Sequence, residues 1–143
     1  MSNRIKLEIL TPDGAIFTGE VDEVILPGSA GELGILPGHL PLMTTLKSGQ
    51  LVGIDGGKRH IFAVHSGFAE ILPNEIIVLT EAAEGADAID LERARVALAR
   101  AEEAMKSVVG PLGEDDAHVT AAEQHQIALE RARARLFVAE DKK

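Results

Sequence analysis

The segment from Ile76 to Arg100 reads IIVLTEAAEGADAIDLERARVALAR, and the hydrophobic pattern changes within it. Up to Thr80 it is a short run of branched and large apolar residues, which favours a β-strand. After Gly85, apolar residues recur at alternating steps of three and four, the spacing of one face of an α-helix. These residues are Leu91, Ala94, Leu98, Ala101, Met105 and Val108. The chain is therefore predicted to contain two modules of different secondary-structure class.

The composition on the two sides of this segment supports the same division. Eleven of the 14 Gly and five of the 6 Pro lie within the first 80 residues, whereas 16 of the 20 Ala follow them. Glycine and proline favour turns between short strands, and alanine has the highest helix propensity. We predict a β domain over residues 1–84 and a helical domain over residues 85–143, in a fold of the α+β class.

The first module shows the alternation of half-buried strands. Ile5, Leu7 and Ile9 alternate with polar residues, and a turn follows at Pro12 to Gly14. Similar apolar stretches recur at residues 15–18, 21–26, 32–36, 42–46, 50–54, 60–64, 68–72 and 76–79. Many short strands with Gly and Pro turns predict an antiparallel β-sandwich or flattened barrel.

The second module is predicted to be an antiparallel helical hairpin. The first helix stops at Gly110-Pro111, and the second begins at Asp116 or at the capping-box sequence that starts at Thr120. A second apolar stripe consists of Ala122, His125, Leu129, Ala132, Leu136 and Ala139. Because both stripes are rich in alanine, little apolar surface is available to hold the hairpin in place. Composition leaves open a hairpin with two arrangements and one that is permanently docked.

Several classes of function are disfavoured by composition and motifs. A formal net charge of −9 disfavours nucleic acid as a partner, and the absence of Cys excludes thiolate metal sites. The apolar runs stay well below the roughly 18 residues of a membrane span, so we expect no direct membrane insertion. Gly57-Lys58 lacks the preceding glycine and the following hydroxyl of a phosphate-binding loop. We expect no catalytic residue and no metal site, which leaves a small β-sandwich enzyme disfavoured.

Three motifs carry a resemblance to a known family. Gly31-Glu-Leu-Gly-Ile-Leu-Pro-Gly-His39, Pro41-Leu42 and Ser66-Gly-Phe-Ala-Glu70 resemble the epsilon subunit of bacterial F-type ATP synthases, over essentially the whole chain. The resemblance implies a non-catalytic central-stalk subunit, peripheral on the cytoplasmic face of the bacterial plasma membrane. It implies that the sandwich docks on the gamma subunit and the ring of c subunits. The hairpin would be mobile and would inhibit ATP hydrolysis when it extends toward the alpha and beta subunits.

The resemblance also implies contact residues. The stretch with Glu32, Leu33, Ile35 and His39 is a candidate for contact with the stalk and ring. The basic residues Arg131, Arg133 and Arg135 are candidates for contact with an acidic surface of the catalytic subunits, since they form a local basic cluster in an acidic chain. The alternative for these arginines is a solvated helix face.

A regulatory ligand is implied by a further motif. The sequence from Ile89 to Ala94, IDLERA, matches the motif with which some epsilon subunits bind ATP in the folded hairpin. The residues that this resemblance assigns to ATP are Glu84, Ile89, Asp90, Arg93, Ala94, Arg100, Arg131 and Arg135. Arginines from two helices can neutralise a triphosphate without a phosphate-binding loop. The alternative is a helix cap with an Asp90–Arg93 surface pair.

The sequence thus supports two hypotheses of different kinds. The first is a central-stalk subunit that requires no cofactor and takes ATP as a regulatory ligand. The second is a free-standing nucleotide-sensing module that acts outside the synthase. The connection from Ser107 to His118 departs from shorter relatives, which bears on whether the arginines converge. The nature of the coupling ion depends on other subunits.

Overall fold

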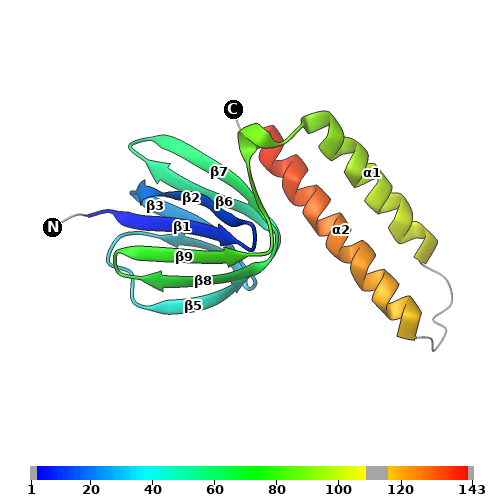
Figure 1. The fold of residues 1–143 in the computed structure, drawn as a ribbon, viewed down its shortest axis with the longest axis horizontal. Helices are drawn as coiled ribbons and strands as arrows, with labels where there is room; N and C mark the ends of the chain where they lie inside the picture. Colours follow the sequence, from blue (N-terminus) through cyan, green and yellow to red (C-terminus); the bar gives the residue numbers. More distant parts are fainter. Residues whose placement is uncertain (1–2, 109–115, 142–143) are drawn as a thin grey trace.

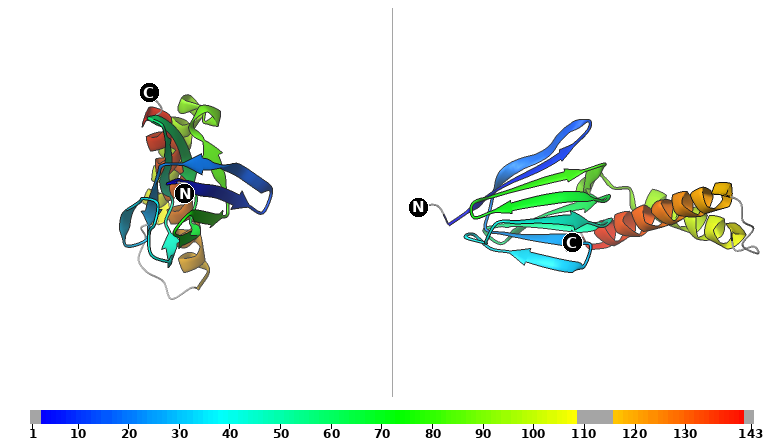
Figure 2. Two further views of the ribbon diagram at one scale, coloured as in Figure 1. Left: turned by 90° about the vertical axis from the view of Figure 1, so that its left-hand side faces the viewer. Right: turned by 90° about the horizontal axis from the view of Figure 1, so that it is seen from below.

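The computed structural model describes residues 3–108 and 116–141, with side chains up to residue 106 and from residue 122 onward. It contains a β-sandwich followed by two long helices, so the predicted α+β arrangement is confirmed. Figures 1 and 2 show the helices lying side by side and projecting from the end of the sandwich opposite the N-terminus. Neither helix, over the described residues, has a segment long and apolar enough to span a bilayer.

The described part of the chain forms ten strands that join into one folded sheet. The strands are β1 (Ile5–Thr11), β2 (Gly14–Val21), β3 (Glu23–Gly28), β4 (Gly31–Ile35), β5 (Leu42–Leu46), β6 (Gly49–Asp55), β7 (Lys58–Val64), β8 (Gly67–Leu72), β9 (Glu75–Thr80) and β10 (Ala83–Gly85). Their order is β10-β7-β6-β3-β5-β8-β9-β1-β2, and β4 pairs with β3. Because the sheet folds over on itself, its inner face closes around a core.

The strands agree with the sequence pattern except at two places. The stretch 21–26 was expected as one strand, but β2 ends at Val21 and β3 begins at Glu23. Asp22 breaks the run because its N–H donates to the Ile54 carbonyl, while its carboxylate accepts from the Gly56 N–H at 2.7 Å. In addition, β1 pairs with β9 in parallel, although antiparallel sheets were expected. A parallel pair joins strands that are distant in sequence, so hairpin signals do not reveal it.

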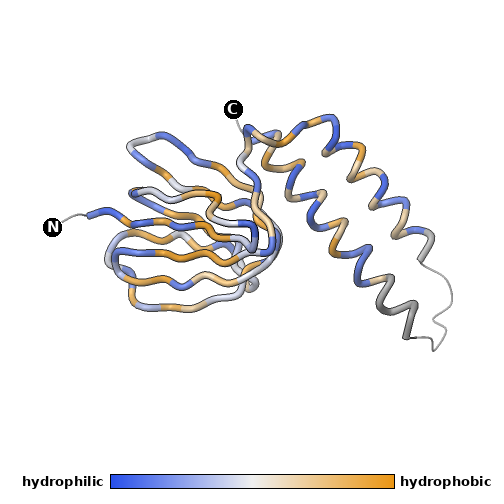
Figure 3. The backbone as a smooth tube through the Cα atoms, viewed as in Figure 1, coloured by the Kyte–Doolittle hydropathy of each residue, from blue (hydrophilic) through white to orange (hydrophobic). Residues whose placement is uncertain are grey.

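The core of the sandwich follows from the alternation in the strands. Ile5, Leu7 and Ile9 are almost fully buried, as are Ile76 and Val78 of the neighbouring β9. A second apolar cluster lies on the outside of β6 and β7, where the sheet meets the hairpin. Figure 3 shows apolar stretches along the strands and a mixture of polar and apolar residues along the helices. The hairpin therefore docks on a surface separate from the main core.

The hairpin consists of α1 (Leu91–Val108) and α2 (Asp116–Asp141), preceded by a 3-10 turn, η1 (Ala86–Ala88). Ala101 on α1 packs against Leu129 and Ala132 on α2, as the two stripes predict. Helix α2 begins at Asp116, so the start expected at Thr120 is wrong and Thr120 lies inside the helix. The break at Gly110-Pro111 lies outside the described residues, as do the side chains of Val108 and Thr120.

Candidate functional site

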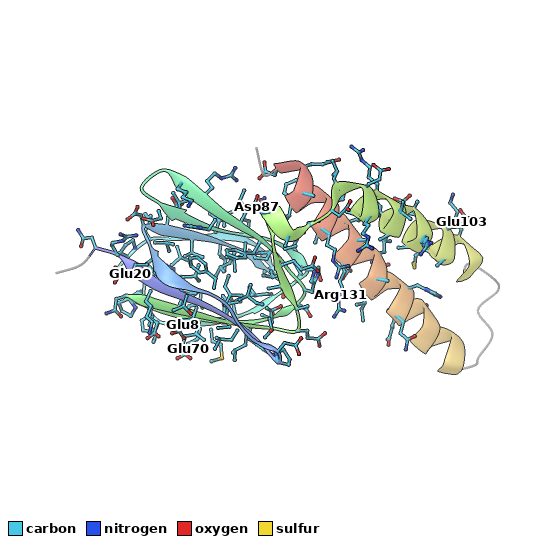
Figure 4. All side chains as sticks on the ribbon, turned by 45° about the horizontal axis from the view of Figure 1, so that its top comes forward. Glu8, Glu20, Glu70, Asp87, Glu103 and Arg131 are labelled. Atoms are coloured by element: carbon cyan, nitrogen blue, oxygen red, sulfur yellow. The ribbon has the colours of Figure 1, made fainter. Side chains whose placement is uncertain are left out.

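The contact between the hairpin and the sandwich brings together three of the charged residues that the sequence singled out, Glu84, Arg131 and Arg135. Arg131 on α2 forms an ion pair with Glu81 at 2.6 Å, and Arg135, one turn later, forms one with Glu84 at 2.7 Å. Each of these four side chains keeps part of its surface in contact with solvent. Figure 4 shows Arg131 where α2 meets the strands, whereas Glu103 lies farther out on α1. Spacing of four on a helix places both arginines on the face toward the sandwich.

A buried histidine lies directly beneath these ion pairs. His65 follows β7 and its side chain is 0% exposed. Neither ring nitrogen has a hydrogen-bond partner among the described residues, and the nearest carboxylate oxygen, Oε1 of Glu84, is 3.5 Å from Nε2. Burial lowers the pKa of His65 to about 4, and the positive charges of Arg135 and Arg131 act in the same direction. The imidazole is therefore neutral at pH 7.

The end of α2 supplies the remaining contacts. Asp141 accepts hydrogen bonds from Gln50 at 2.7 Å and from Arg59 at 3.1 Å. These bonds, that from Gln50 first, hold the pKa of Asp141 below its ordinary value. Beside them Val138 and Ala139 are buried against apolar residues of β6 and β7. Among the described residues, three ion pairs, the hydrogen bond from Gln50 and a small apolar patch thus hold the hairpin to the sandwich.

The motif residues at the start of α1 have structural partners. Ile89 and Ala94 are buried in the apolar cluster between hairpin and sandwich. The carboxylate of Asp90 accepts a hydrogen bond from the backbone N–H of Arg93 at 3.1 Å, which caps α1. The side chains of Arg93 and Arg100 are exposed, and within the described residues they form no ion pair. Asp90 thus caps the helix, and no Asp90–Arg93 ion pair forms between the described side chains.

A groove between the two helices contains two of the four arginines. Its volume is about 350 Å³, and its lining is Ala97, Ala101, Gln124, Ile127, Ala128, Arg131, Ala132 and Arg135. Arg100 lies at a different hollow, with Glu103 and Lys106. The structure therefore places Arg131 and Arg135 together at one groove and does not bring Arg93 and Arg100 into its lining.

The stretch expected to contact the stalk and ring is partly a strand. Residues 31–35 form β4, so the connecting loop spans only residues 36–41. Ile35 is 1% exposed and belongs to the core, which corrects its assignment as a contact residue, because its side chain does not reach the surface. Leu33 packs partly against the same core, Glu32 is exposed, and His39 is half-buried with Nδ1 2.6 Å from the Leu40 carbonyl oxygen.

An apolar surface on the outer face of the sandwich was not predicted. Phe68 and Leu79 are 55% and 52% exposed and lie opposite each other on β8 and β9. Register places Leu10 beside Leu79 and Thr45 beside Phe68, so the four form a row across β1, β9, β8 and β5. A shallow groove of about 620 Å³ follows this row. The sequence feature that could have predicted this surface is the run Ile76 to Leu79, because four consecutive apolar residues make both faces of the strand apolar.

Comparisons with known proteins agree with this architecture. Residues 4–86 match the family model described as "ATP synthase, Delta/Epsilon chain, beta-sandwich domain", and residues 87–140 match "ATP synthase, Delta/Epsilon chain, long alpha-helix domain". The ATP synthase epsilon chain of Geobacter metallireducens is 43% identical over 97% of this chain and 96% of its own length. That of Desulforamulus reducens is 44% identical over 98% of this chain and its whole length.

Solved structures show the same fold. A chain of the Euglena gracilis mitochondrial ATP synthase, in a structure of "OSCP/F1/c-ring in rotational state 1", matches with a TM-score of 0.78 and 26% identity over 98% of this chain and 83% of its own. The Tetrahymena thermophila central stalk and c-ring structure matches at a TM-score of 0.57 and 11% identity, covering 92% and 96%, and supports the fold alone. The chain belongs to the ATP synthase delta/epsilon chain family. It is thus a subunit of ATP synthase other than the catalytic subunit.

Within the residues that the structure describes, no group of three or more His, Asp or Glu side chains could hold a metal ion. The polar residues of the hairpin contact can instead form ion pairs and take up a proton. Their chemistry is suited to holding two domains together reversibly.

Proposed function

We propose that this chain is the epsilon-type subunit of the central stalk of a bacterial F-type ATP synthase, peripheral on the cytoplasmic face of the plasma membrane. The sandwich docks on the gamma subunit and the c-ring. The hairpin inhibits ATP hydrolysis when it leaves the sandwich and extends toward the alpha and beta subunits. The observation that carries this proposal is the small, partly solvated contact that holds the hairpin.

The contact is weak enough for two arrangements to coexist. Partly exposed ion pairs such as Arg131–Glu81 contribute roughly 0–1 kcal/mol each. The apolar part of the contact rests on Val138 and on alanines, which bury little surface. Both helices also pack against each other, through Ala101 and Leu129 for example, so the hairpin keeps contacts of its own when it leaves the sandwich. The docked and the extended state therefore differ in free energy by only a few kcal/mol.

The inhibitory role is tested by ending the chain after Ala86 and assembling the shortened subunit into the enzyme. We expect ATP hydrolysis to rise relative to the enzyme with the full chain. Unchanged hydrolysis would contradict the inhibitory role. Proton transport coupled to ATP hydrolysis, measured in membrane vesicles, should be retained, because the proposed docking surfaces lie in the sandwich.

We assign the docking of the gamma subunit to the apolar row that contains Phe68 and Leu79. Exposed apolar rows of this kind mark protein interfaces. The loop 36–41 lies at the opposite end of the sandwich from the hairpin, since Gly38 donates a backbone hydrogen bond to Pro73 in the β8–β9 turn. Glu32 and His39 are the candidates there for contact with the c-ring.

Phe68→Glu tests the gamma docking surface. We expect the variant chain to co-purify poorly with the remaining ATP synthase subunits, because a charge would be buried in the apolar interface. Val96→Glu is a matched control, since Val96 is 47% exposed on α1, outside the row. Equal loss in both variants would argue against the row as the interface.

We further propose that ATP binds the folded hairpin with its phosphates near Arg131 and Arg135. Support comes from the groove, whose lining combines four alanines with these two arginines. In the structure the two guanidinium groups form ion pairs with Glu81 and Glu84. A bound triphosphate would replace these carboxylates as the hydrogen-bond acceptor of both arginines. Arg93 and Arg100, exposed and without an ion pair among the described residues, would turn toward the ligand. ATP would favour the docked state in proportion to its preference for that state.

Calorimetric titration of ATP into the isolated chain tests this site. We expect binding to be lost in the variant with both Arg93→Ala and Arg131→Ala, because two phosphate contacts are removed. Arg133→Ala is the control on the same helix, where the side chain is exposed and outside the groove. Equal affinity in the wild type and the double variant would remove the proposed site.

A further inference from the structure

His65 lies on the face of the sheet against which the docked hairpin packs, near Arg131 and Arg135 of α2. Ile61 and Ala63 of β7 point outward into the apolar cluster that contains Val138 and Ala139 of α2. Because side chains alternate along a strand, His65, two residues further, continues the same face. Its backbone N–H is fixed by the Ala82 carbonyl at 3.1 Å and by the Thr80 hydroxyl at 3.3 Å. The backbone of His65 is thus fixed where α2 meets the sheet.

A buried imidazole with two unpartnered nitrogens is an unusual feature in a well-packed contact. Alanine or valine at this position would fill space without the cost of burying a polar ring. The neighbouring charges come from two sides, Arg131 and Arg135 from α2 and Glu84 from β10, with Glu81 between β9 and β10. The contact therefore tolerates a neutral ring and is poorly suited to a charged one.

We propose that His65 makes the docking of the hairpin sensitive to protons, because a protonated imidazole is disfavoured under α2 and favours the undocked state. The consequence for the enzyme, stronger inhibition of hydrolysis at lower pH, rests on the proposed inhibitory function of the extended hairpin. The effect on docking itself is a property of this chain alone.

Glu84 only partly offsets the charge of a protonated His65: its carboxylate favours the charged ring, but burial and the charges of Arg135 and Arg131 outweigh it. Its Oε1 is 3.5 Å from Nε2 of His65 but accepts a hydrogen bond from Arg135 at 2.7 Å. If the protonated ring drew Oε1 of Glu84 toward it, Arg135 would have to share that oxygen, which weakens the contact that ties α2 to β10. If it did not, the ring would remain buried beside two arginines. Docking is weakened in either case.

The pH range follows from the two states of the ring. In the docked state the pKa of His65 is lowered from the ordinary 6.5 to about 4, and on undocking it returns toward 6.5. Docking is therefore strongest above pH 6.5 and weakens as the pH falls from 6.5 to 4. Linkage gives a rise of about 20-fold in the ratio of undocked to docked chain between pH 7 and pH 5. Asp141, with a pKa below its ordinary 3.8, acts only at still lower pH.

Fluorescence energy transfer in the isolated full chain tests this inference. The chain has no cysteine, so Lys58→Cys and Glu140→Cys provide two unique labelling positions, both exposed and on opposite sides of the contact. Urea is added until about a tenth of the chains are undocked at pH 7, so that changes in either direction are measurable. We expect the undocked fraction to rise as the pH falls to 5.

Two variants separate His65 from other groups. His65→Gln should remove the pH dependence between pH 7 and pH 5, whereas His60→Gln, a histidine on β7 that contacts Phe17 instead, should retain it. In the unlabelled wild type, the imidazole resonances of His65 should titrate well below pH 6.5, a measurement that needs no variant. Docking that is independent of pH, or pH dependence that persists in His65→Gln, would overturn the inference.

These measurements are independent of the truncation experiment. Loss of the pH effect in the isolated chain would refute the role of His65 and leave the inhibitory function as it stands. Unchanged hydrolysis after truncation would refute the inhibitory function and leave the proton-sensitive docking intact.

Discussion

The connection between β7 and β8 has a backbone that only certain residues accept. Ser66 has a φ of 58° and Gly67 a φ of 134°, both in the region that L side chains avoid. A Cβ atom at Gly67 would lie 2.0 Å from the carbonyl oxygen of Leu79, on the paired strand β9. Glycine is therefore required at this position by its neighbour as well as by its own φ.

Gly67→Ala is expected to destabilise the sandwich. The substitution combines an unfavourable φ with a backbone clash, so we expect the free energy of unfolding to fall by about 1–3 kcal/mol. Urea unfolding followed by circular dichroism measures this change. Gly34→Ala serves as the control, since a Cβ there would meet nothing closer than 3.8 Å and its φ is ordinary. Similar stabilities of the two variants would contradict the role assigned to Gly67.

At the scale of single elements, α2 shows what the sequence could and could not predict. Leu129 and Ala132 face α1 as the three–four stripe indicates. Val138, outside that stripe, is 0% exposed because the end of α2 has a second neighbour, the sheet. The apolar repeat along a single helix shows one buried face, here the face toward α1. It does not show a second contact, here the one with the sheet. For the same reason the pairing of Arg135 with Glu84, 51 positions earlier, could not be derived from spacing.

Val138→Ala is expected to weaken docking of the hairpin while leaving both domains folded. Removing two methyl groups from a buried contact costs about 1–2 kcal/mol, which corresponds to a rise of roughly tenfold in the ratio of undocked to docked chain. Energy transfer between the labels at Lys58→Cys and Glu140→Cys measures this ratio. Phe137→Ala is the control, because Phe137 is the adjacent residue but 58% exposed. Equal effects would place the contact elsewhere on α2.

At the scale of the whole molecule, the two candidate contact surfaces belong to different parts of the sandwich. The row with Phe68 and Leu79 crosses β1, β9, β8 and β5, whereas the hairpin packs on β6 and β7. Glu81 lies at the edge of both, since it lines the apolar groove and pairs with Arg131. A partner bound to the row therefore leaves the apolar contact around Val138 uncovered.

This separation predicts that docking of the sandwich and docking of the hairpin vary independently. Distant substitutions without shared partners have additive free energies. Phe68→Glu should reduce co-purification with the other synthase subunits without changing the undocked fraction of the isolated chain, and Val138→Ala should do the reverse. The double variant should show both effects at unchanged size. A substitution that altered both quantities would mean that the sandwich transmits binding at one face to the hairpin at the other.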